Sequence, residues 1–196
     1  MLRKHQRTLQ KIWFIVSCVL ISAGLQRYAD LFIYWREALF GEFWRLWTAH
    51  WVHVGWIHYG LNMLAFACLP FIFPHVRNRD LVILLLLLSP LISLSFYYIL
   101  PTIDAYAGLS GVLHGLYVTV AIIYSRYRQE RKFSFLVLGL VLAKLVWENT
   151  FGHTDTAELI GSPVLVEAHL LGVIWGGVLA LLYLAYHQGK RLISPV

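Results

Sequence analysis

Hydrophobic residues fall into six long runs, and the segments between these runs hold most of the charged residues. About 20 consecutive apolar residues are needed to cross a bilayer as a helix, so the runs predict transmembrane helices. We therefore expect an all-α membrane protein, a six-transmembrane-helix bundle that forms a single membrane domain over 1–196 with an outer loop at 30–53. The predicted helices are 12–29, 54–73, 81–100, 109–125, 133–149 and 164–186.

The fourth and fifth runs are too short for a full crossing, and the fourth begins beside Ser110. This shortness predicts a water-filled recess above the serine. Ser110 lies in the string Gly108-Leu109-Ser110-Gly111, whose glycines would let backbone and substrate approach a hydroxyl closely. The same glycines could simply ease helix packing, and these four residues alone leave both interpretations open.

Composition and charge narrow the class of protein. The chain is 59% hydrophobic and 13% charged, whereas soluble domains carry about 25% charged residues. Its net charge of +6 comes from clusters at the ends of apolar runs, where basic residues orient helices against anionic lipid. We therefore expect the lipid bilayer, and no nucleic acid, as a partner. Cys18 and Cys68 lie inside apolar runs and predict neither a disulfide nor a metal site.

The basic residues also predict an orientation. If six helices are threaded alternately, twelve of the sixteen Lys and Arg residues fall on one side. The positive-inside rule makes this side cytoplasmic, so both termini are expected there, with the first run retained as a helix. The twelve are Arg3, Lys4, Arg7, Lys11, Arg77, Arg79, Arg126, Arg128, Arg131, Lys132, Lys190 and Arg191.

Polar side chains inside the apolar runs gather near the opposite, outer face. Such groups are costly in a membrane and are functional candidates by default. They are brought to one depth by four of the predicted helices: His58 and Asn62, Ser110 and His114, Glu148, and His169. A transporter would need a polar path to both sides, which this one-sided distribution does not offer.

The chemistry that this set favours is nucleophilic. Ser110 would need a base, and His169 can reach it only if the fourth and sixth helices touch. Pairs of glycines four apart in both helices favour that contact: Gly111 with Gly115, and Gly172 with Gly176.

Donors for a developing oxyanion are also present among the candidates. His58, Asn62 and the backbone N–H of Ser110 would supply them, although His58 and Asn62 could instead hold helices together. Glu167 projects away from His169 around the helix, so no acidic residue is expected to orient the histidine. The sequence therefore favours a Ser-His dyad.

No cofactor or metal is expected. His50, His53 and His58 are the nearest approach to a ligand cluster, but no carboxylate or thiol joins them. Lys144 and Glu148 are four residues apart and are interpreted as a mutually neutralising pair. A role for Glu148 in gating or in receiving a substrate segment is the alternative.

Four ordered motifs resemble the signature of rhomboid intramembrane serine proteases. They are Trp44-Arg45, His53-x4-His58-x3-Asn62, Gly108-Leu109-Ser110-Gly111 and Ala168-His169-x2-Gly172-x3-Gly176. The resemblance covers about residues 44 to 177. It implies a rhomboid-like six-helix core with Ser110 as nucleophile, His169 as general base and acid, and His58 and Asn62 as oxyanion donors. It also implies that Arg45 fixes the first outer loop and that His53 fixes a loop by hydrogen bonding.

Within the family, the string Gly-Leu-Ser-Gly-Val-Leu-His-Gly resembles the rhombosortases of bacteria. This implies an enzyme of the cytoplasmic membrane, opening to the outer side, that cleaves membrane-anchored proteins with a C-terminal Gly-Gly, a transmembrane helix and a basic tail. Two departures stand out: His114 replaces a tyrosine that many bacterial rhomboids place against the catalytic histidine, and Val118 replaces a glycine. The alternative is a catalytically inactive rhomboid-like protein that binds membrane clients. The oligomeric state is left open.

Overall fold

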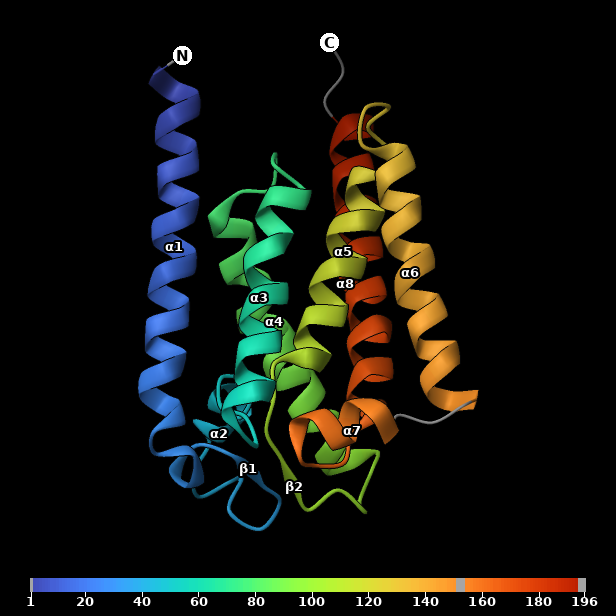
Figure 1. Cartoon of the computed structure of the whole chain (residues 1–196). Coiled ribbons are helices and arrows are strands. Elements are labelled where there is room, and N and C mark those ends of the chain that lie inside the picture. The colour runs from blue at the N-terminus through green and yellow to red at the C-terminus, as the bar shows by residue number, and fades with distance from the viewer. Residues whose placement is uncertain (1, 151–153, 194–196) are drawn as a thin grey trace.

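Figure 1 shows the protein as a computed structural model, which describes residues 2–150 and 154–193. Over these residues eight α-helices make up most of the chain. The elements are α1 (Leu2–Gln26), η1 (Ala29–Leu31), β1 (Tyr34–Trp35), α2 (Arg45–Thr48), α3 (Trp56–Ile72), α4 (Asn78–Tyr98), β2 (Ala105–Tyr106), α5 (Ser110–Tyr124), α6 (Arg131–Thr150), α7 (Thr154–Ile160) and α8 (Val166–Ile193).

Each of the six apolar runs coincides with a helix, namely α1, α3, α4, α5, α6 and α8. Four of them, α1, α4, α6 and α8, are long and apolar enough to cross a membrane, whereas α3 and α5 have only 17 and 15 residues. The prediction that the fifth run falls short was wrong. It forms α6, which reaches 20 residues because the helix continues through polar residues at both ends of the run.

The connections hold more regular structure than expected. The segment 30–53 contains part of η1 together with β1 and α2, and α7 lies between the fifth and sixth runs. In Figure 1 these short elements lie together at one end of the bundle, whereas α1 begins and α8 ends at the other. An even number of long passes connects the two ends, which agrees with termini on one side.

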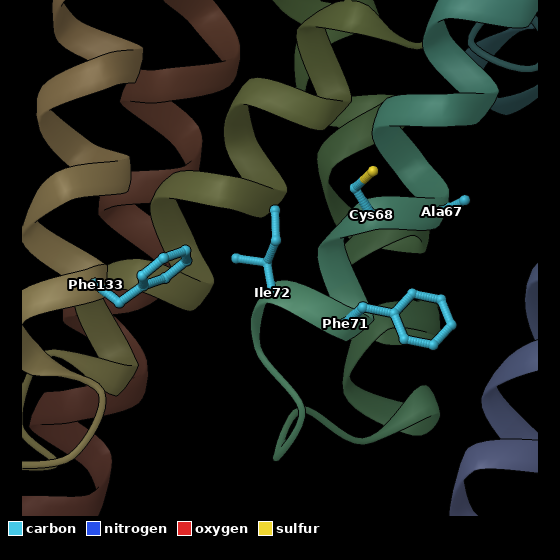
Figure 2. Close-up of a pocket in the computed structure, with 5 residues that line it drawn as sticks. All are labelled: Ala67, Cys68, Phe71, Ile72 and Phe133. Atoms are coloured by element: carbon cyan, nitrogen blue, oxygen red, sulfur yellow. The ribbon is translucent and has the colours of Figure 1, made fainter.

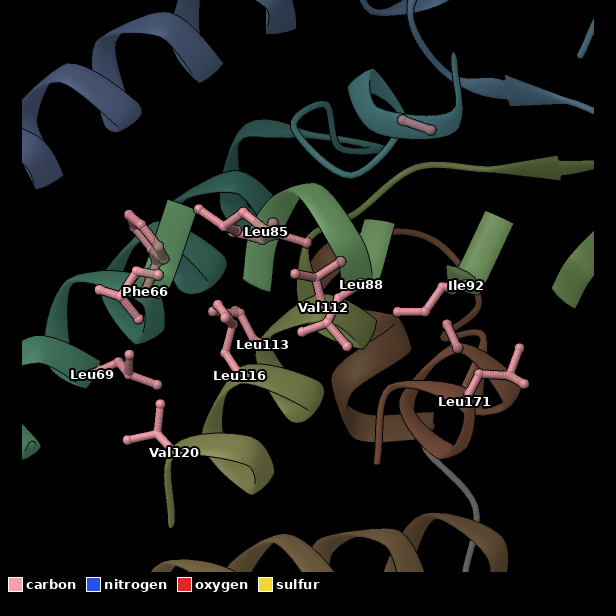
Figure 3. Packing of buried hydrophobic residues seen from close by; sticks show 14 of the residues in the cluster. Phe66, Leu69, Leu85, Leu88, Ile92, Val112, Leu113, Leu116, Val120 and Leu171 are labelled. Carbon is pink, nitrogen blue, oxygen red and sulfur yellow. The ribbon is translucent and has the colours of Figure 1, made fainter. Parts of the chain in front are cut away.

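The core lies where α3, α4, α5 and α8 meet. Figure 3 shows the aliphatic and aromatic side chains that these helices contribute, and all ten labelled residues are buried. They are Phe66, Leu69, Leu85, Leu88, Ile92, Val112, Leu113, Leu116, Val120 and Leu171. Large apolar side chains on the outward faces of α1, α6 and α8 are exposed, as expected for surfaces in contact with lipid chains.

The closest helix contact joins α5 and α8. A Cβ added at Gly172 would collide with the carbonyl oxygen of Gly111, and one added at Gly176 would lie 2.5 Å from the carbonyl oxygen of Gly115. Only glycine therefore permits the observed approach of the two backbones. Thr119 adds a hydrogen bond between the helices, because its Oγ1 lies 2.9 Å from the carbonyl oxygen of Gly176. The contact predicted from the glycine spacing is confirmed.

The segment 30–53 is held by two arginines, one buried and one partly buried, that donate hydrogen bonds to backbone carbonyls. Arg45 is buried and donates to the carbonyl oxygens of Ile33 and Asp30, at 2.6 and 3.2 Å, and its Nε also contacts Glu42. Arg36 donates to several carbonyls at the end of α4, including that of Phe96 at 2.6 Å. The structural role expected for Arg45 agrees with this geometry.

An apolar groove separates α3 from α6 at the end where α3 finishes. Figure 2 shows its lining, with Phe133 projecting from α6 toward Ile72 of α3. The groove has a volume of about 560 Å³ and is also lined by Ala67, Cys68 and Phe71. Because its walls carry almost no polar atoms, it is suited to a hydrocarbon chain or an apolar helix.

Candidate active site

The strand β2 leads directly into the site and is fixed on both sides. It pairs antiparallel with β1, so that Tyr106 lies opposite Tyr34. The Tyr106 hydroxyl donates to the carbonyl oxygen of Gly108 at 2.6 Å, and the N–H of Gly108 donates to the carbonyl oxygen of Ala49 at 3.0 Å. These bonds hold the backbone just before Ser110.

Gly108 is required by this backbone path. Its φ of +146° lies in a region that residues with a side chain rarely adopt. A Cβ at this position would also lie 2.9 Å from Cε1 of His58, so the imidazole packs directly against the glycine. The next N–H, that of Leu109, points to Nε2 of His53 at 3.4 Å, which agrees with the loop-fixing role expected for His53.

Ser110 is the first residue of α5, and His169 lies in the first turns of α8. The glycine contact between these helices brings the two side chains together, with Nε2 of His169 2.9 Å from Oγ of Ser110. His169 is buried, with 3% of its surface exposed. The backbone N–H groups of the first turn of α5 have no partner within the helix and point toward the same end.

A carboxylate contacts the other side of the histidine. Oε2 of Glu148 lies 2.8 Å from Nδ1 of His169, and Oε1 of Glu148 contacts Nζ of Lys144. The expectation that no acidic residue orients His169 was therefore wrong, and three side chains align where a dyad was predicted. Helix α6 provides this carboxylate on the single stripe that it buries, which consists of Ser134, Val137, Leu145 and Glu148.

The hydrogen-bond partners determine which ring nitrogen carries the proton. An ionised carboxylate only accepts hydrogen bonds, so Nδ1 of His169 donates to Glu148. In the neutral ring Nε2 then has a free lone pair, and it faces the Ser110 hydroxyl. This tautomer is the one that can remove a proton from the serine.

His114 stacks on the histidine. The two rings are 4.2 Å apart at an interplanar angle of 19°, and Nδ1 of His114 donates to the carbonyl oxygen of Ser110 at 2.7 Å. The position that departs from the family pattern thus still supplies a flat ring against His169. His114, Glu148 and His169 also form the one cluster with metal-ligand spacing among the described residues.

His58 and Asn62 are on the same face of α3 and line the cavity beside Ser110. The Asn62 amide donates to the carbonyl oxygen of His58 at 2.9 Å, which leaves one of its two N–H groups for another acceptor. The structure thus brings both residues predicted as oxyanion donors to the serine.

The cavity over Ser110 is large and mostly apolar. Its volume is about 1060 Å³, and it extends from Gln26 at the end of α1, past the serine, to Ile72 of α3. Leu140 and Lys144 of α6 form part of the opposite wall. A recess above the serine was predicted from the short run, and the structure contains one.

Comparison with known proteins identifies the family. A family model described as the Rhomboid domain matches residues 40–186. The chain belongs to the rhomboid family. Rhomboids are generally intramembrane serine proteases that act on membrane proteins within the bilayer. None of the curated proteins compared with the chain matches it. Together with its apolar helices, this membership makes the protein a multi-pass membrane rhomboid.

From the sequence, Glu148 was expected to have a role other than the one that its contacts in the structure indicate. Glu148 was expected to neutralise Lys144 or to act in gating, and its contact with His169 was missed. A signal was available, because the carboxylate lies at the depth of Ser110 when residues are counted along α6 from its first residue, Arg131. What the sequence lacked was the rotation of α6 about its axis, which decides whether Glu148 faces His169.

Proposed function

We propose that this rhomboid is an intramembrane serine endopeptidase that acts through an acyl-enzyme. The observation that carries the proposal is the 2.9 Å contact between Oγ of Ser110 and Nε2 of His169 at the wall of a cavity. His169 removes the proton of the Ser110 hydroxyl as Oγ attacks the scissile carbonyl carbon. The same histidine then gives that proton to the leaving amine, and water hydrolyses the ester by the reverse proton path.

The oxyanion formed in each step needs nearby donors. The free N–H of Ser110 at the start of α5 and the side chains of His58 and Asn62 are suitable, because they line the same cavity. Removing one such donor typically slows a reaction about 10²- to 10³-fold. The mechanism requires no metal or cofactor.

The substrate in this proposal is a membrane-anchored protein whose transmembrane helix lies against the apolar wall between α3 and α6. The short α3 and α5 complete a six-helix domain with the site near the outer face of a bacterial cytoplasmic membrane and both termini in the cytoplasm. The rhombosortase-like string at 108–115 favours substrates with a C-terminal Gly-Gly, helix and basic tail.

A serine-directed probe tests the chemistry without knowledge of the substrate. Purified wild-type protein should react with a fluorophosphonate at Ser110, and the Ser110→Ala and His169→Ala variants should not, while all three unfold at similar temperatures in detergent. Absence of labelling in the folded wild type would identify a rhomboid that binds membrane clients without cutting them.

The substrate class needs a second measurement. Membrane proteins from cells with wild-type enzyme are compared with those from cells with Ser110→Ala. A protein with a Gly-Gly, helix and basic tail should keep its tail only in the variant cells. If proteins of another type accumulate uncut, the protease assignment holds and the rhombosortase-like substrate does not.

A further inference from the structure

Glu148 is a buried carboxylate on a helix whose other buried side chains are small or apolar. Only 6% of its surface is exposed, and its two oxygens contact two different groups, Nδ1 of His169 and Nζ of Lys144. We propose that Glu148 is the positioning residue of the catalytic histidine and completes a Ser110–His169–Glu148 relay across three helices. This inference rests on the proposed protease function and assigns α6 a direct part in it.

The first step of the argument is the orientation of the ring. Nε2 of His169 lies 2.9 Å from Ser110, and Nδ1 lies 2.8 Å from Glu148, so both nitrogens have a partner in the plane of the ring. His114 covers one ring face at 4.2 Å. The carboxylate therefore fixes both the rotation of the imidazole and its Nδ1–H tautomer, which leaves Nε2 free to accept the serine proton.

The second step concerns charge. When His169 takes the serine proton, it becomes an imidazolium. This cation is buried, because only 3% of the surface of His169 is exposed. A buried cation needs a close partner of opposite charge, because water is absent to stabilise it. Glu148 is the one carboxylate at hydrogen-bond distance from His169 among the described residues. Its negative charge is thus available where the positive charge develops.

Lys144 explains how a carboxylate remains charged at this depth. Its ammonium contacts Oε1 of Glu148, and its side chain is 47% exposed. Before the reaction Lys144 balances Glu148, and during it the carboxylate lies between two cations. The other ionisable groups around His169 are His114, stacked on its ring, and His58, which lines the same cavity. Lys144 therefore supports the carboxylate and does not contact the histidine ring.

The competing explanation is that Glu148 and Lys144 form an ion pair with a structural role only. The two explanations predict different results for the double variant, which carries both Glu148→Gln and Lys144→Met. If Glu148 only neutralises Lys144, then removing both charges should restore a working site. If Glu148 positions His169, the double variant lacks the same group as Glu148→Gln and should be equally slow.

The test measures how fast a fluorophosphonate labels Ser110. In this reaction the Oγ–P bond forms, the P–F bond breaks with fluoride leaving, and the hydroxyl proton passes to Nε2 of His169. The rate at saturating probe and the half-saturating concentration are recorded separately for the wild type and for Glu148→Gln, Lys144→Met, the double variant, and the control Glu167→Gln. Glu167 is an exposed carboxylate two residues from His169.

We expect Glu148→Gln to lower the saturating rate at least about 10²-fold, since loss of the corresponding acid in a serine protease triad costs up to about 10⁴-fold. The half-saturating concentration should be unchanged. Glu167→Gln should stay within about tenfold of the wild type, and the double variant should be as slow as Glu148→Gln. Lys144→Met should fall between these two, because it keeps the carboxylate that contacts His169 but removes its counter-charge. Should Glu148→Gln fail to fold, the double variant provides the same comparison without leaving Lys144 unpaired.

Two results would overturn the inference: wild-type labelling by Glu148→Gln, or recovery of the wild-type rate in the double variant. Both presuppose that the wild type is labelled. A folded wild type that does not react at all contradicts the proposed protease function itself, so the two failures are distinguishable.

Discussion

At the scale of single residues, His169 is held from three directions by groups from two helices, α5 and α6. Ser110 of α5 and Glu148 of α6 contact the two ring nitrogens, and His114 lies against a ring face. His114 is itself fixed by its hydrogen bond to the Ser110 carbonyl. His114, where the sequence led us to expect a tyrosine in many bacterial rhomboids, therefore still places a flat aromatic ring against His169.

This contact leads to a prediction for His114. Stacked aromatic pairs contribute about 0.5–1.5 kcal/mol, so His114→Ala should slow fluorophosphonate labelling of Ser110 by up to about tenfold. His114→Phe keeps a ring at the same place and should lie closer to the wild type. Equal rates for the Ala and Phe variants would show that stacking is not what His114 contributes.

The site residues could be predicted to different extents. Ser110, His169, His58 and Asn62 were found because each places a polar group in an apolar run at one depth, and depth follows from counting residues along a helix. The role of Glu148 could not be found in this way. It depends on how α6 is rotated, and the hydrophobic pattern of α6 is too uniform to define one buried face.

At the scale of elements, the glycine contact between α5 and α8 sets the distance from serine to histidine. A Cβ at Gly172 would overlap the backbone of Gly111, one residue after Ser110. The helices would have to separate to make room, and their separation would move His169 away from the serine.

We therefore predict that Gly172→Ala lowers fluorophosphonate labelling by more than about 10²-fold and also lowers the unfolding temperature in detergent. Gly177→Ala on the same helix is the matched control, because a Cβ there has no neighbour within 4 Å. Similar behaviour of the two variants would contradict the proposed importance of the close approach.

Helices were more predictable than the segments that connect them. All six apolar runs became helices because uninterrupted hydrophobicity is a strong signal for a membrane helix. The strands β1 and β2 and the helix α7 gave no such signal, since each is short. Their conformation depends on tertiary hydrogen bonds, such as those of Arg36 to the end of α4.

At the scale of the whole molecule, the segment 30–53 is attached to the bundle through buried histidines that lie outside the long apolar helices. His50 follows α2 in the sequence and is fully buried, with Nε2 3.0 Å from Oγ of Ser93 in α4. Burial lowers the pKa of His50 from 6.5 to about 4. The folded protein therefore keeps this ring neutral over a range of pH in which the unfolded chain would protonate it.

This difference predicts acid sensitivity. The contribution of His50 is fully present above the unfolded pKa of 6.5 and is lost as the pH falls from 6.5 toward the folded pKa of about 4. At about pH 5 the loss amounts to about 2 kcal/mol. Thermal unfolding in detergent at about pH 7 and about pH 5 measures it. His50→Gln, which does not titrate, should show a smaller change between the two, and an identical change would contradict the assignment.

The glycine contact between α5 and α8 has a consequence for how this protein can diversify. Backbone packing brings the helices of the reactive pair together, whereas α3, α6 and the loops supply most of the cavity wall. The residues proposed for the reaction and the apolar residues of the cavity wall are thus different, even where one helix supplies both. If the proposed protease function holds, exchange of Leu61 or Leu140, which line the cavity, is expected to change which membrane helices are cleaved more than how fast Ser110 reacts.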